Sequence, residues 1–154
     1  MATRRNSYNE RLFKAILEGK GKESVIRASK YRKAVERSKS ESEIQQECIR
    51  WFKENYPQLA QEGMLFHIAN EGIRLGGMGA RFKREGIVKG VADLCLAIPR
   101  HGYGALYIEM KRPGTYQRPE QKAWQQAVEK YGSKYVVCRS VQEFIVEVNR
   151  YLSL

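Results

Sequence analysis

The chain has 154 residues, 42% of them hydrophobic, which suffices for one compact domain with its own core. No apolar run of the sequence approaches the length of about 18 residues that a membrane span needs. The N-terminus also lacks the apolar segment of a signal peptide, so we expect no membrane association. Three separated cysteines without a Cys-x-x-Cys pair favour a reduced, intracellular protein, located in the cytoplasm or nucleoid. The net charge of +11 favours a polyanionic partner, most simply nucleic acid.

Most of the positive charge lies in an N-terminal arm, residues 1–40. The arm has 12 Lys and Arg against 4 Asp and Glu, a net of +8, whereas residues 41–154 have 16 against 13, a net of +3. Apolar residues at helical spacing predict that the arm is helical. We interpret it as an extension that binds nucleic acid. The alternatives are a solvated extension that aids solubility and a helical dimer interface.

Seven elements are predicted after the arm, in the order α-β-β-β-α-β-α. The first helix has Ser40 as N-cap, Glu43 completing a capping box, and Pro57 after its end. Alternation and turn residues then predict three strands, a helix opened by Pro119, a strand, and a last helix capped by Ser140. In chain order the seven segments are 40–57, 64–70, 93–99, 105–111, 118–132, 134–139 and 140–152. This order predicts an α/β fold.

The segment 90–114, "GVADLCLAIPRHGYGALYIEMKRPG", contains Asp93, the only aspartate of the chain. If the segment is a hairpin centred on His101, Asp93 lies opposite Glu109, with Cβ atoms roughly 5 Å apart. Lys111 follows two residues after Glu109 and points to the same side. The opposite face is then apolar core, formed by Leu94, Leu96, Ile98, Ile108 and Met110.

Two carboxylates this close repel each other unless a positive charge lies between them. A hard cation such as Mg²⁺ suits such oxygen ligands. The alternative is an exposed Glu109–Lys111 pair on a solvated sheet face, because short patterns of this kind recur often.

The first helix offers a third carboxylate. At 100° per residue its apolar stripe consists of Ile44, Cys48, Ile49 and Phe52. Glu41 falls near the centre of this stripe, whereas Glu43 lies on the opposite face. A glutamate on the buried side indicates a polar site, and the alternative is an ordinary acidic residue that favours a helix N-terminus.

These pieces together resemble the VRR-NUC domain, a branch of the PD-(D/E)xK nucleases with a restriction-endonuclease-like fold. The resemblance covers about residues 41–152 and rests on "ESEIQ", "IANEGIR", "FKREGIVKGVADL", "YIEMK", "RPEQKAW" and "KYGSKYVVCRS" in order. It implies a mixed sheet flanked by helices in residues 41–154, preceded by the basic arm. Ala92 stands where the family often has a proline.

The resemblance also implies phosphodiester hydrolysis with Mg²⁺ or Mn²⁺. The metal ligands would be Asp93, Glu109 and the backbone carbonyl of Met110, with Glu41 binding the same metal or a second one through water. Lys111 would orient the nucleophile and stabilise the transition state, and Gln121 would position Lys111 or the attacking water.

The expected DNA-binding residues are Asn70, Arg74, Arg81, Lys83, Arg84 and Lys89. For Asn70 and Arg74 an ordinary polar turn is an equal alternative.

Stand-alone members of this family resemble Holliday-junction resolvases and are typically homodimers, whereas other relatives act on flaps. We therefore expect a dimeric endonuclease selective for branched DNA. The alternatives are a non-catalytic DNA-binding protein that has retained the fold, a flap or nicking nuclease, and a sequence-specific restriction enzyme.

Overall fold

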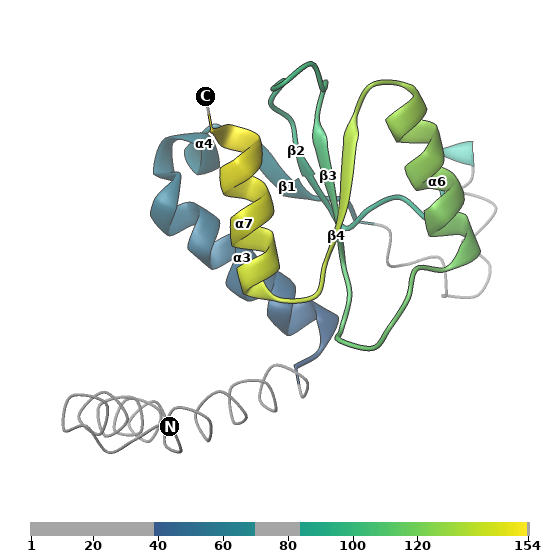
Figure 1. Ribbon diagram of the computed structural model, residues 1–154, viewed down its shortest axis with the longest axis horizontal. Coiled ribbons are helices and arrows are strands. Elements are labelled where there is room, and N and C mark those ends of the chain that lie inside the picture. Colours follow the sequence, from purple (N-terminus) through teal and green to yellow (C-terminus); the bar gives the residue numbers. More distant parts are fainter. Residues whose placement is uncertain (1–38, 70–83, 154) are drawn as a thin grey trace. The chain divides into compact units, whose positions relative to one another are not determined.

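The computed structural model describes residues 39–69 and 84–153, which form a four-stranded mixed sheet with helices on both faces (Figure 1). The strand order is β1-β2-β3-β4, antiparallel except for the parallel pair of β3 and β4. The strands are β1 (Leu65–His67), β2 (Leu94–Leu96), β3 (Leu106–Met110) and β4 (Lys134–Cys138). The helices are α3 (Glu41–Asn55), α4 (Pro57–Gln61), α6 (Pro119–Lys130) and α7 (Val141–Leu152). In Figure 1, α3, α4 and α7 lie on one side of the sheet and α6 lies on the other. The predicted α/β class and mixed sheet are confirmed.

The predicted caps of the first and last helices are present. The Glu43 N–H donates to the Ser40 hydroxyl at 3.2 Å, and the Ser40 N–H donates to the Glu43 carboxylate at 2.8 Å, which completes a capping box. The Ser140 hydroxyl likewise accepts from the Glu143 N–H at 3.1 Å. The short helix α4 was not predicted. Pro57 ends α3 as expected, but it also occupies the first turn of α4, where its missing N–H costs no helical hydrogen bond.

The β2–β3 register agrees with the sequence prediction. Leu94 pairs with Ile108 and Leu96 with Leu106, so the ladder extended by one residue sets Asp93 opposite Glu109. The turn, however, is not centred on His101 as predicted. Arg100 pairs with Tyr103, so the centre of the turn lies between His101 and Gly102, which both have positive φ. The β2 side therefore has one residue more than the β3 side between turn and ladder. Without that extra residue, Asp93 would move to the opposite face of the sheet.

The core lies between the sheet and the helices α3 and α7. Its fully buried apolar side chains come from α3, β2, β3, β4 and α7 and include Ile44, Phe52, Leu94, Leu96, Leu106, Ile108, Met110, Phe144 and Val148. All three cysteines are buried, as predicted, and none forms a disulfide with another described residue. Of the helices in the described ranges, none is long and apolar enough to cross a membrane.

A close backbone contact joins Gly90 to the start of α6. Gly90 has a φ of +82°, and a Cβ atom there would lie 2.5 Å from the carbonyl carbon and oxygen of Glu120 and 2.9 Å from the Gln121 nitrogen. Only a residue without a side chain allows this approach. The segment leading to Asp93 and the first turn of α6 are thereby held against each other.

We expect Gly90→Ala to be more destabilising than Gly63→Ala. Both glycines have positive φ, so each substitution costs about 1–2 kcal/mol of backbone strain. Gly63 has no other described atom within 4 Å of the added Cβ, whereas at Gly90 the start of α6 must move, which costs about 1–3 kcal/mol more. Denaturant unfolding of both variants measures the difference, and equal losses would show that the contact does not constrain α6.

Candidate active site

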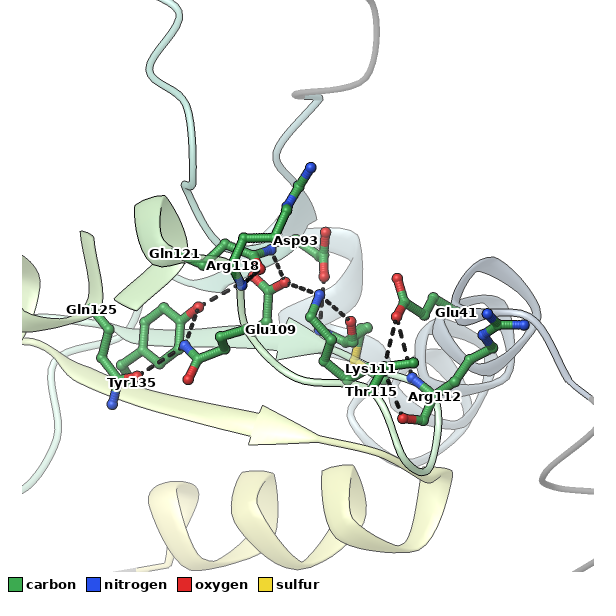
Figure 2. Close-up of polar contacts among 12 residues, drawn as sticks. Glu41, Asp93, Glu109, Lys111, Arg112, Thr115, Arg118, Gln121, Gln125 and Tyr135 are labelled. Carbon is green, nitrogen blue, oxygen red and sulfur yellow. Dashed lines mark hydrogen bonds and ion pairs between the residues drawn. The ribbon is translucent and has the colours of Figure 1, made fainter. Parts of the chain in front are cut away.

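Asp93 directly precedes β2 and is held by contacts from two strands (Figure 2). Its Oδ2 accepts a hydrogen bond from the Met110 N–H at 2.7 Å, which connects it to β3. Its backbone carbonyl accepts from the Ile68 N–H at 2.9 Å and lies 2.9 Å from Nδ1 of His67, at the end of β1. The position of this carboxylate is therefore determined by pairing on both sides of β2.

Glu109, near the end of β3, has a fully buried carboxylate (0% exposed). Its Oε1 accepts hydrogen bonds from Nζ of Lys111 and Nε2 of Gln121, and its Oε2 accepts from the Tyr135 hydroxyl at 3.1 Å. Figure 2 shows these three donors converging on the carboxylate, Lys111 from just after β3, Gln121 from α6 and Tyr135 from β4. Such hydrogen bonding is what allows a carboxylate to remain buried.

Lys111 is the cation that contacts this buried carboxylate. It is 7% exposed, and its Nζ also donates to the Met110 carbonyl at 3.2 Å. The predicted convergence of Asp93, Glu109 and Lys111 on one face is therefore present. The alternative of an exposed Glu–Lys pair on a solvated face is wrong, because both side chains are buried.

Both Asp93 and Glu109 have a raised pKa, and burial is the largest cause in each case. Burial raises the pKa of Asp93; the Met110 N–H and the Lys111 ammonium oppose this, while the nearby charge of Glu41 adds to it. Burial also raises the pKa of Glu109, and the charge of Asp93 raises it further, against the opposing effect of Lys111. A further cation beside these groups would favour their ionised forms.

Gln121 is positioned by the start of α6. It is 3% exposed, and its Oε1 accepts from the Arg118 N–H at 2.8 Å, as the third residue of a capping box does. This bond turns its Nε2 toward Glu109. Gln121 lies beside the site as predicted, but its side chain donates to Glu109 rather than to Lys111.

Tyr135 was missed by the sequence analysis. It lies on β4, whose parallel pairing sets it beside Tyr107, two residues before Glu109 and on the same face of the sheet. Burial raises the pKa of Tyr135, and the charge of Glu109 raises it further, so the hydroxyl remains a neutral donor. The available signal was a tyrosine within the strand "KYVVC", but its partner depends on the β3–β4 register.

Glu41, in the first turn of α3, contacts the loop between β3 and α6. Its Oε1 accepts from the Arg112 N–H at 3.2 Å and the Thr115 hydroxyl at 3.3 Å. It is near enough to Asp93 to raise the pKa of that carboxyl. Within residues 39–69 and 84–153, however, no three His, Cys, Asp or Glu side chains are grouped closely enough to hold one metal ion. The helix-phase prediction located Glu41 beside the site, and its role as a metal ligand stays a prediction.

The donors at the site fit a hard divalent cation. Asp93, Glu109 and the Met110 carbonyl supply oxygen ligands, the type that Mg²⁺ and Mn²⁺ prefer. The raised pKa values of both carboxyls indicate that a positive charge would be accepted there. These three groups would hold the ion.

The predicted DNA-binding residues are only partly described. Arg84 and Lys89 are exposed in the segment before Asp93. Four others lie outside the described residues: Asn70, Arg74, Arg81 and Lys83. Residues 1–38 of the basic arm lie outside them as well.

We expect Asp93→Asn to stabilise the metal-free protein increasingly as pH rises. Below the ordinary aspartate pKa of 3.8 both folded and unfolded wild type are protonated, and the charge has no effect. Because the folded pKa is raised, ionisation at higher pH favours the unfolded state. Melting temperatures with a chelator present, from acid to neutral pH, should show a growing advantage of the variant. A constant or shrinking difference would contradict the raised pKa.

Comparison with known proteins agrees with this geometry. The sequence model of the VRR-NUC domain matches residues 39–142. A solved structure described as a VRR_NUC domain protein is 27% identical, with a TM-score of 0.64, and the match covers 75% of this chain and 89% of that one. No curated protein matches the chain. The family match spans most of the chain and includes Asp93, Glu109, Lys111 and Gln121, so the protein belongs to the VRR-NUC domain family, a nuclease family that acts on DNA.

Proposed function

We propose that this protein is a Mg²⁺- or Mn²⁺-dependent endonuclease that acts as a homodimer on branched DNA such as Holliday junctions. The observation that carries the proposed chemistry is the convergence of the fully buried Glu109 carboxylate and the partly buried Asp93 carboxylate on one sheet face beside Lys111. Metal dependence is supported by the fit of these oxygen donors to a hard cation. Branched substrates and the dimer are inferred from the resemblance to stand-alone members of the family, since a two-fold dimer offers two sites for two strands.

The bound cation would neutralise charge on the scissile phosphate and lower the pKa of the attacking water. Lys111 carries the protein's own positive charge into the site. Its ammonium, held by Glu109 and the Met110 carbonyl, would orient the water and stabilise negative charge that develops on the phosphate oxygens. The water oxygen bonds to phosphorus as the ester bond breaks, and the leaving oxygen takes up a proton.

Gln121 and Tyr135 would act through Glu109. Each donates to a different oxygen of this carboxylate, so together they determine its rotation about the last side-chain bond. Precise carboxylate orientation is what partners of metal ligands provide. Glu41 would hold the loop after Lys111 and contribute negative charge, with contact to a metal through water. The exposed Arg84 and Lys89 would contact the phosphate backbone.

The proposal is tested by cleavage of labelled junction, flap, nicked and linear DNA with Mg²⁺, Mn²⁺ or EDTA. We expect metal-dependent cleavage with preference for junctions. Asp93→Asn and Glu109→Gln should each lower the rate by more than about 100-fold while DNA binding persists, because they remove metal ligands rather than DNA contacts. Wild-type rates in the Asp93→Asn protein would show that the assigned site is wrong. Binding without any metal-dependent cleavage by the wild type would indicate a non-catalytic DNA-binding protein.

Glu41 and Glu43 form a matched pair on the first turn of α3. We expect Glu41→Ala to lower the cleavage rate by about 10- to 100-fold, because the loop after Lys111 loses its two hydrogen bonds. Glu43→Ala removes the capping-box bonds from the Ser40 N–H and hydroxyl, so it should retain activity and lose about 1 kcal/mol of stability. Cleavage rates and denaturant unfolding of both variants measure the contrast. The reverse ranking of rates would assign the functional carboxylate to the other face of α3.

A further inference from the structure

We propose that the loop Arg112–Arg118, between β3 and α6, binds an unpaired nucleotide next to the cleaved phosphate, with the Tyr116 ring stacked on its base. This substrate loop begins directly after Lys111 and ends at the residue that caps α6. The inference rests on the proposed function. It adds a substrate feature to that function, namely a base that is not in a double helix.

Tyr116 is 80% exposed, and it forms no hydrogen bond or ring contact with any described residue. Tyr131, at the other end of α6, is equally exposed, but the Lys130 ammonium covers its ring at 5.5 Å from the centroid. A 12-residue helix separates Tyr131 from the substrate loop. Tyr116 is therefore a highly exposed ring in the loop that begins after Lys111, and both faces of this ring are available for stacking.

The backbone around Tyr116 is fixed although its ring is exposed. The Thr115 N–H and hydroxyl donate to the Arg112 carbonyl at 3.0 and 2.8 Å, which closes a turn. Glu41 accepts from the Arg112 N–H, and Gln121 accepts from the Arg118 N–H, so both ends of the loop are bound to site residues. Binding a ligand to a loop that is already ordered costs less entropy.

Two exposed arginines flank the tyrosine. Their backbone N–H groups are engaged, but among the described residues neither the Arg112 nor the Arg118 guanidinium forms an ion pair. In Figure 2, Arg112 lies on the Glu41 side of the carboxylates and Arg118 on the Gln121 side. A nucleotide within a strand has a phosphate on each side of its base. In the loop sequence an aromatic residue lies between two arginines, and this order matches the order of charge and π-surface along a strand.

Stacking requires a base with a free face. In a continuous duplex each base is already stacked between its neighbours, whereas bases at gaps, flaps and junction openings can turn outward. Tyr116 therefore favours DNA with an unpaired base over a continuous duplex. The arginines contact phosphates in both kinds of DNA and do not distinguish them.

The test uses the full-length chain with Asp93→Asn, in EDTA, so that binding is measured without cleavage. Two probes contain 2-aminopurine, once unpaired in a short gap and once paired in a continuous duplex. We expect Tyr116→Ala to bind the gapped probe about 10-fold more weakly and the duplex within about two-fold of the parent. Fluorescence quenching of the unpaired 2-aminopurine should disappear in Tyr116→Ala. Tyr116→Phe should retain both affinity and quenching, because the ring suffices for stacking, and Tyr131→Ala should match the parent.

Unchanged affinity of Tyr116→Ala for the gapped probe would overturn the inference, and so would an equal loss on both probes. Loss in Tyr131→Ala as large as in Tyr116→Ala would also overturn it, since it would show a general effect of surface aromatic rings. Cleavage of junction and flap DNA by the wild type with Mn²⁺ is scored separately. Failure of the wild type to cleave would reject the proposed function, and the binding comparison would still decide the role of Tyr116.

Discussion

The buried carboxylate of Glu109 constrains the site more than any other group. An ionised carboxylate removed from water is unstable unless hydrogen bonds and positive charge replace its hydration. Here Lys111, Gln121 and Tyr135 replace it, each from a different part of the fold. Even so, the raised pKa of Glu109 indicates that the replacement is incomplete. A site that disfavours its own charges without metal is suited to bind a cation.

The rest of the domain can be understood as the means of bringing these donors together. The antiparallel β2–β3 pair sets Asp93 across from Glu109. Parallel pairing places β4 beside β3, with Tyr135 on the same face of the sheet as Glu109. Gly90 allows the start of α6 to approach closely enough for Gln121 to reach the carboxylate. On the opposite face of the strands, apolar side chains pack against α3 and α7. The same strands therefore supply a hydrophobic core on one face and the charged site on the other.

Several features were predictable because they depend on local chemistry. The capping box at Ser40 and Glu43 involves residues three apart, and the strands of the β2–β3 hairpin are close in sequence. The helix α4 was missed because five residues show too little periodicity, and Pro57 indicates a helix end as well as a helix start. The predicted register was right although the turn differs, because the extra residue on the β2 side maintains the face of Asp93.

The sequence by itself determined the α/β order and the residues Asp93, Glu109 and Lys111 as a group, because alternation and spacing decide which side chains share a face. The nuclease family followed from the motifs that resemble the VRR-NUC domain and from the family model that matches residues 39–142. Only the tertiary structure decided that Tyr135 completes the hydrogen bonding of Glu109 and that Glu41 holds the substrate loop. Both contacts join residues 26 or more positions apart. Such pairs depend on strand order and helix placement, which no local pattern specifies.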